Sequence, residues 1–192
     1  PVEVNSNYYK LSNQYFQDQV NQFMANYQQN KFVIFYSEQQ ARNQKIVPNQ
    51  VLRLSFDDFV VGQTYVKEKV EKLKKDSVVI GETRANGKVY GTVTATLSVF
   101  DKTVASSGLL DLTISDWQTR KIIKRKKLPG TYIWQDQWAN YKGDERALTK
   151  QQLAMTNRSE ILPTAPAVLF VEFTKPIYAQ LVDEVNSFYS RY

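Results

Sequence analysis

The stretch from Lys88 to Val99, which reads Lys-Val-Tyr-Gly-Thr-Val-Thr-Ala-Thr-Leu-Ser-Val, is the clearest structural signal in the sequence. Apolar residues and Gly91 occupy its odd-numbered positions, and polar residues or Tyr90 occupy the even-numbered ones. Because side chains alternate between the two faces of a strand, this pattern predicts a strand with one buried face. Asn86-Gly87, a strong hairpin signal, comes just before it. We therefore predict a long twisted hairpin that pairs roughly residues 64–80 with 88–104.

The first strand of this hairpin has a second interpretation. Val66, Val70 and Leu73 have helical spacing, and the Lys and Glu residues between them are good helix formers. No stop signal separates this segment from the apolar residues at 78–80. The strand is therefore favoured, and a helix over 64–75 is the alternative.

Further strands are expected on both sides of the hairpin. Phe32 to Tyr36 is a run of five β-branched or aromatic residues, which predicts a strand covered on both faces. A second strand is expected near 51–58, and strands at 108–114 and 121–127 should be joined by a turn at 116–120. Pro129-Gly130 is expected to break the last of these before another strand begins at Thr131.

Helices are predicted at both ends of the chain. Residues 6–30 carry apolar residues at helical spacing, namely Tyr9, Phe16, Val20, Phe23 and Tyr27. Thr149 and Gln152 form a capping-box pattern, and the apolar residues from Phe170 to Tyr192 again have helical spacing. Pro176 lies inside that last pattern, which predicts a kink or two helices in series.

These expectations define the fold class. We predict a single α+β domain over residues 1–192: an N-terminal helix at about 6–30, an antiparallel or mixed meander sheet at about 32–134, and C-terminal helices at about 144–192. The chain has 192 residues, with no Cys and no His. It can therefore form no disulfide, thiolate nucleophile, zinc finger or Ser-His-Asp triad. We predict no catalytic residue, no metal and no cofactor.

The formal net charge is +6, and six of the cations fall within eight residues. The candidate binding residues are this basic run and two nearby tryptophans, namely Arg120, Lys121, Lys124, Arg125, Lys126, Lys127, Trp117 and Trp138. Clustered cations with aromatic side chains can bind phosphates and stack on bases, or can bind an anionic membrane or cell-wall surface. The favoured interpretation of the run is a solvated edge strand whose Lys residues block unwanted strand pairing.

Two groups of acids are candidates for catalysis. Asp57-Asp58 follows a predicted strand, and Asp144-Glu145 precedes a predicted helix. Paired carboxylates can perform acid–base chemistry, but acids in these places are usually turn formers and helix N-caps. The caps and turns are the favoured interpretation.

Parts of the sequence resemble a family of uncharacterised cell-envelope proteins and lipoproteins of Bacteroidota, over roughly residues 50–192. The segments that carry this resemblance are 108–117, 128–134, 143–148 and 170–192. It implies export to the periplasm or outer membrane, with an N-terminal lipid anchor. No signal peptide is visible, no run of about 18 apolar residues exists, and a chain that starts at Pro1 is expected to have been processed or trimmed.

A second resemblance is to the α/β domain of curli-export and penicillin-binding-protein-activator lipoproteins. Their strands are joined through an Asp-x-x-Thr-Gly turn, which corresponds here to Asp116 to Arg120. This chain has Arg120 where that family has Gly.

The sequence thus predicts a non-enzymatic cell-envelope module that binds a protein partner or an anionic envelope component. It would contact the membrane only through an N-terminal anchor outside this chain. One alternative is a nucleic-acid-binding domain that uses the basic hairpin 120–127, although nucleic acid is the less favoured partner. Another is a carboxylate-based hydrolase.

Overall fold

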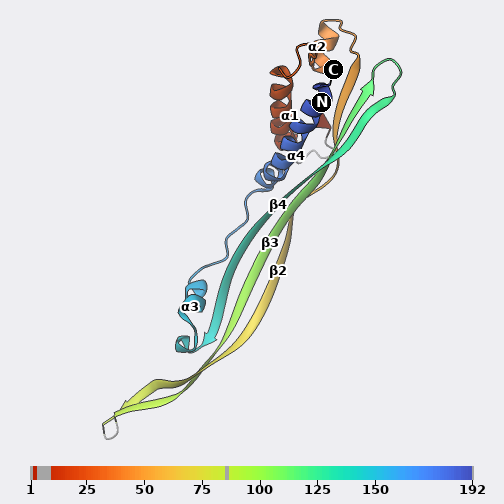
Figure 1. The fold of residues 1–192 in the computed structure, drawn as a ribbon. Coiled ribbons are helices and arrows are strands. Elements are labelled where there is room, and N and C mark those ends of the chain that lie inside the picture. The colour runs from red at the N-terminus through yellow and green to blue at the C-terminus, as the bar shows by residue number, and fades with distance from the viewer. Residues whose placement is uncertain (1, 4–9, 85–86, 192) are drawn as a thin grey trace. The chain divides into compact units, whose positions relative to one another are not determined.

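A computed structural model describes residues 2–3, 10–84 and 87–191. It shows an α+β fold (Figure 1), as predicted. The sheet has the order β1-β2-β3-β4, in which β1 (Val2–Glu3) pairs in parallel with β2 (Gln50–Thr83) at Leu54 and Ser55. Two hairpins then join β2 to β3 (Gly87–Asp116) and β3 to β4 (Ile122–Gly143). The sheet is therefore mixed, with a meander of three long strands.

The helices are α1 (Lys10–Ala25), α2 (Glu38–Asn43), the 3-10 helix η2 (Glu145–Ala147), α3 (Lys150–Thr156) and α4 (Pro166–Tyr189). The predicted capping box of α3 is confirmed, because Thr149 and Gln152 each bond the other's backbone N–H. Pro176 lies within α4, which stays one continuous helix. The alternative of two helices in series is therefore wrong.

The predicted long hairpin is confirmed, and the alternative of a helix over 64–75 is wrong. The Lys and Glu residues of this segment do favour a helix locally, but pairing with β3 along its whole length outweighs that preference. Val93, Ala95 and Leu97 are buried, as their alternation predicts. From Lys102 onward the buried positions of β3 are even-numbered except for Asp111, so the face of the strand that is buried changes between Leu97 and Lys102.

The chain divides into two compact units. Unit 1 contains residues 1–63, 105–133 and 164–192, and unit 2 contains residues 64–104 and 134–163. Each of β2, β3 and β4 contributes one part to each unit. The single domain predicted for residues 1–192 requires that the two units unfold together in one cooperative transition.

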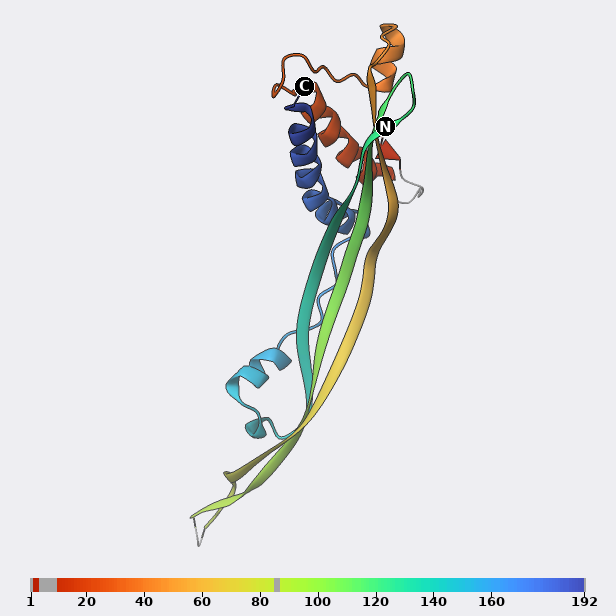
Figure 2. The same ribbon diagram turned by 45° about the vertical axis from the view of Figure 1, so that its right-hand side comes forward.

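The core of unit 1 lies between the sheet and two helices, α1 and α4, which pack against each other (Figure 2). Its fully buried aromatic residues are Phe16 from α1 and Phe170 and Phe173 from α4. The strands contribute the buried residues Leu54, Phe56, Leu110, Leu112, Ile114 and Leu128. Phe56 makes edge-to-face contacts with all three of those buried aromatic residues, at centroid distances of 5.5, 5.7 and 6.3 Å.

Pro129-Gly130 does not end a strand, which corrects the prediction, because β4 runs through it from Ile122 to Gly143. β4 is at the edge of the sheet, where a Pro without an N–H is tolerated. A Cβ on Gly130 would lie 2.2 Å from the backbone oxygen of Phe173. The glycine therefore marks the close approach of α4 and not a break.

Residues 32–36 form no strand, which also corrects the prediction. Val33 and Phe35 pack against the core of unit 1, whereas Phe32 is 91% exposed and Ile34 is 69% exposed. Phe35 contacts the rings of Tyr27 and Tyr189 at 5.2 and 5.1 Å. The segment buries alternate side chains against aromatic residues and is not covered on both faces. The preceding helix, predicted for 6–30, ends at Ala25, and residues 6–9 lie outside the described residues.

Unit 2 has a smaller core, formed by Ala95, Leu97, Ala139 and Leu148. An extended segment after α3 is held to the strands by polar contacts. Asp136, buried in β4, accepts a hydrogen bond from the backbone N–H of Ile161 at 2.8 Å. Lys102, buried in β3, pairs with Glu160 at 2.5 Å.

Candidate binding surface at the β3–β4 turn

The turn between β3 and β4 positions Trp117 and Arg120. Asp116 accepts hydrogen bonds from the backbone N–H and the hydroxyl of Thr119, at 2.7 and 2.8 Å. These two bonds lower the pKa of Asp116, and the bond from the backbone N–H has the larger effect. The backbone N–H of Trp117 donates to the carbonyl of Asn49 at 2.9 Å, which fixes the turn to the segment before β2. The predicted turn at 116–120 is thus present and is closed by the Asp and Thr side chains.

Arg120 has a φ of +61°, in the left-handed region that favours glycine. A glycine would adopt this conformation without the strain that an arginine bears. The Arg120 guanidinium lies 4.3 Å from the centroid of the Trp117 ring. That cation–π contact offsets part of the conformational cost.

The basic run after the turn is divided between the two faces of the sheet. Because β4 is a strand, its even-numbered residues face one way and its odd-numbered residues the other. Lys124 and Lys126 both bind Glu184 of α4, the first with an Nζ–Oε2 distance of 2.6 Å. Hydrogen bonds from these two lysines lower the pKa of Glu184.

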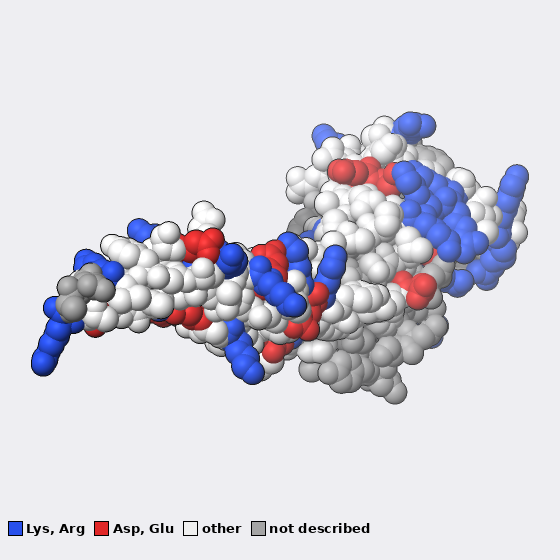
Figure 3. Space-filling model, turned by 90° about the horizontal axis from the view of Figure 1, so that it is seen from below, with Lys and Arg blue, Asp and Glu red and all other residues white. Residues whose placement is uncertain are grey.

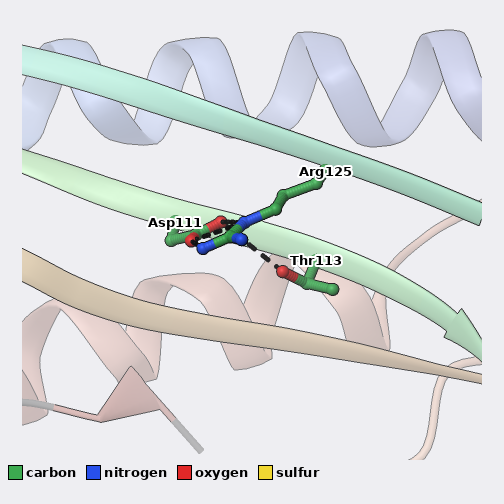
Figure 4. Close-up of polar contacts among 3 residues, drawn as sticks. All are labelled: Asp111, Thr113 and Arg125. Carbon is green, nitrogen blue, oxygen red and sulfur yellow. Dashed lines mark hydrogen bonds and ion pairs between the residues drawn. The ribbon is translucent and has the colours of Figure 1, made fainter. Parts of the chain in front are cut away.

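Arg125 faces the other way and binds Asp111 of β3 (Figure 4). Its Nε lies 3.2 and 2.9 Å from the two carboxylate oxygens, and its terminal Nη2 also binds Asp111. Asp111 is only 5% exposed. The hydrogen bonds from Arg125 lower its pKa, despite an opposing effect of burial, and Lys127 adds a weaker favourable charge.

The six predicted cations therefore do not form one patch. Lys124, Arg125 and Lys126 are paired with acids and tie β4 to α4 and to β3. Arg120 and Lys121 are exposed at the turn, next to Ile122 and Ile123, which are 54% and 44% exposed. Figure 3 shows one face of the molecule, on which Lys and Arg side chains gather in one region and Asp and Glu side chains lie next to it.

A depression of about 410 Å³ lies beside this turn, between β4 and the end of α4. Its lining combines apolar and cationic side chains, namely Ile123, Lys124, Ser187, Phe188 and Arg191. The Lys124 ammonium lies 5.6 Å from the centre of the Phe188 ring. Such a lining suits a group that is anionic at one end and apolar at the other.

Sequence reasoning did not select Ser187, Phe188 or Arg191 as binding residues. Helical spacing did indicate an apolar stripe that contains Phe188, but not that this stripe ends beside Ile123 and Lys124. We call Trp117, Arg120 to Ile123, Lys124, Phe188 and Arg191 together the turn surface.

Trp138, the other predicted tryptophan, belongs to unit 2. Its ring stacks on that of Phe100, with centroids 5.3 Å apart and an angle of 13° between the planes. Trp117 and the basic run belong to unit 1. Trp138 is therefore paired within the unit 2 sheet and is not part of the turn surface.

Asp144 is a cap residue, as predicted, but Asp58 is not a turn residue. β2 runs through it to Thr83, because pairing with β3 continues, so the prediction of a strand that ends near residue 58 in a turn is wrong. Asp144 is the N-cap of η2 and accepts a hydrogen bond from the Arg146 backbone N–H at 3.0 Å. Hydrogen bonds from the Arg146 side chain, which has the larger effect, and from the Arg146 backbone N–H lower the pKa of Asp144 to about 2. Asp58 is exposed, and the side chain of Asp57 lies outside the described part of the structure. In that described part, no group of three or more Asp or Glu residues could hold a metal ion.

No protein-family model and no curated protein matches this chain. Across residues 2–3, 10–84 and 87–191, none of the helices combines the length and the apolar character needed to cross a bilayer.

Proposed function

We propose that this protein is a non-enzymatic, exported module of the cell envelope, in the periplasm or at the outer membrane, and that its turn surface binds an anionic lipid surface. The observation that carries the proposal is the combination, in unit 1, of exposed Ile122 and Ile123 with the exposed cations Arg120 and Lys121. Apolar side chains next to cations fit a membrane interface, where the first group enters the acyl boundary and the second binds headgroups.

The depression beside the turn supports the same proposal. An anionic headgroup there would meet Arg191, and an acyl segment would meet Ile123 and Phe188. Export is supported by the resemblance of residues 50–192 to cell-envelope proteins. Asp116 and Asp144 hold turn and cap hydrogen bonds and Asp111 pairs with Arg125, so the proposal gives these acids no catalytic role.

Co-sedimentation of the full chain with vesicles tests this function. We expect binding to vesicles that contain phosphatidylglycerol, little binding to pure phosphatidylcholine, and a loss of binding as salt is raised. Replacing Arg120 by Asn and Lys121 by Gln should weaken binding about tenfold or more, since each cation near an anionic surface contributes about 1 kcal/mol. Asn is chosen at position 120 because it tolerates a positive φ.

The matched control removes two exposed cations from unit 2, Lys75→Gln with Lys88→Gln, and should leave binding nearly unchanged. Equal effects of the two double variants would mean that net charge alone drives binding, which contradicts the proposal. Tighter binding of a labelled single-stranded oligonucleotide than of the anionic vesicles would instead favour the nucleic-acid alternative.

A further inference from the structure

β2 has an open edge in unit 2. One edge of β2 pairs with β3, and the other pairs with β1 only at Leu54 and Ser55. Among the residues that the structure describes, no strand follows on that second edge beside residues 64–76. Figures 1 and 2 both show β2 as the outermost strand there. The backbone groups of such an edge can pair with a strand of another chain.

The sequence at this edge is complementary to itself. Residues 67–72 read Lys-Glu-Lys-Val-Glu-Lys. If two copies pair antiparallel about a two-fold axis at Val70, Lys69 of each copy lies opposite Glu71 of the other, and Glu68 lies opposite Lys72. Both directly opposed charge pairs are then of opposite sign, which is the stabilising arrangement.

Neighbouring registers lack this complementarity. A two-fold axis perpendicular to the strands places one residue opposite its own copy. An axis at any of Glu68, Lys69, Glu71 or Lys72 would place like charges in contact. An axis at Leu73 would place Lys72 opposite Lys74. The charges of 67–72 thus favour the register about Val70.

The exposure of these side chains fits the same register. Val70 is 57% exposed, and two copies would bury it against itself at the axis. Lys69 and Glu71 of one chain already bind each other at 2.5 Å, with the Lys69 side chain 68% exposed. In the pair of chains they would join their copies in a cluster of four alternating charges.

We propose that two copies of this chain associate through antiparallel pairing of the β2 edge about Val70, with Lys69 opposite Glu71 and Glu68 opposite Lys72. This self-association is independent of the lipid binding proposed for unit 1.

Sedimentation equilibrium of the full chain is the first test. The wild type should be a dimer that dissociates within a range of about 1 to 500 µM, as expected for a small interface. Lys69→Glu and Glu71→Lys should each raise the dissociation constant about tenfold or more, because each creates two like-charge pairs across the axis. The control Lys88→Glu, on an exposed residue of β3, should leave it unchanged.

A mixture of the Lys69→Glu and Glu71→Lys variants distinguishes a contact between two chains from a contact within one chain. Lys69→Glu has acids at both positions and Glu71→Lys has cations at both, so the two variants should form a heterodimer although each alone is largely monomeric. The contact between 69 and 71 within each chain stays repulsive in that mixture, so a role confined to one chain would give no recovery. A wild type that stays monomeric throughout the range, or a mixture that gives no heterodimer, would overturn the proposal.

Cross-linking gives an independent test of the register, because the chain contains no cysteine. Val70→Cys should form a disulfide-linked dimer under mild oxidation, since residues at the axis face each other across about 4.5–5.5 Å. Ile80→Cys, which is similarly exposed at 54%, should cross-link far more slowly because it is not opposite itself. Equal rates for the two variants would refute the register.

Discussion

In unit 1 the sheet is covered by two helices, and its core contains fourteen buried residues, many of them aromatic. In unit 2 the same three strands continue, but only four residues form the buried cluster, two of them alanines. Polar anchors at Asp136 and Lys102 hold the covering segment there. The difference shows how continuous strands can be stabilised by apolar burial along one part and by specific hydrogen bonds and ion pairs along another.

Core truncations in each unit should have the largest effects. Phe170→Ala in unit 1 should lower the free energy of unfolding by about 3–5 kcal/mol, because it leaves a large cavity in a closely packed core. Leu97→Ala in unit 2 should cost about 2–5 kcal/mol, toward the lower end because the small cluster can collapse more easily. Urea unfolding followed by circular dichroism measures both, with the exposed Phe32→Ala expected within about 0.5 kcal/mol of wild type.

The same two variants test the prediction of a single domain. If the chain unfolds as one domain, both substitutions shift one shared transition. Two separate transitions, each moved only by the substitution in its own unit, would show that the units are thermodynamic domains.

Lowering the pH should destabilise the protein mainly through unit 1. The pKa of Asp111 is lower in the folded protein than in the unfolded chain, so its pairing with Arg125 stabilises the fold above the unfolded value, about 4. That stability is lost as the pH falls through the folded value. Asp111→Asn should therefore cost about 1–3 kcal/mol at pH 7 and less at low pH, so the variant's stability should depend less steeply on pH.

Urea unfolding of both proteins between pH 7 and 2 measures this difference. Asp144 in unit 2 also has a lowered pKa, but it is a surface pair with Arg146. Asp144→Asn is thus expected to change the pH profile far less than Asp111→Asn. A larger change in the pH profile for Asp144→Asn than for Asp111→Asn would contradict this expectation.

The smallest effect is expected at the β3–β4 turn. Arg120→Gly relieves the positive φ but loses the contact with Trp117, so the two changes nearly cancel. Arg120→Ala loses the contact and keeps the strain, and should be less stable than Arg120→Gly by about 1 kcal/mol. Equal unfolding midpoints for the Ala and Gly variants would show that the left-handed conformation has no cost there.

The sequence predicted the elements with strong local signals: the alternation of 89–99, the capping box at Thr149 and the turn at Asp116. It failed where a distant segment decides the outcome. Phe32 to Tyr36 has strand composition but packs on aromatic residues of α1 and α4. Pro129-Gly130 has the composition of a strand break, but Gly130 instead leaves room for the close approach of α4.

Sequence reasoning predicted only part of the candidate site. The basic run and Trp117 were found from composition, but the assignment of alternate cations to Glu184 and Asp111 depends on neighbours 14 or more residues away. The depression required knowing that Arg191 and Phe188 lie beside Ile123. Local pattern does not encode such contacts.

The change of buried face between Leu97 and Lys102 has an evolutionary consequence. Along β3, odd-numbered side chains face the core of unit 2 and even-numbered side chains face the core of unit 1. Loss or gain of a single codon within β3 would reverse the facing of every side chain up to the next turn, and would expose the apolar row while burying its polar neighbours. Natural length variation among descendants of this gene should therefore concentrate in the hairpin ends.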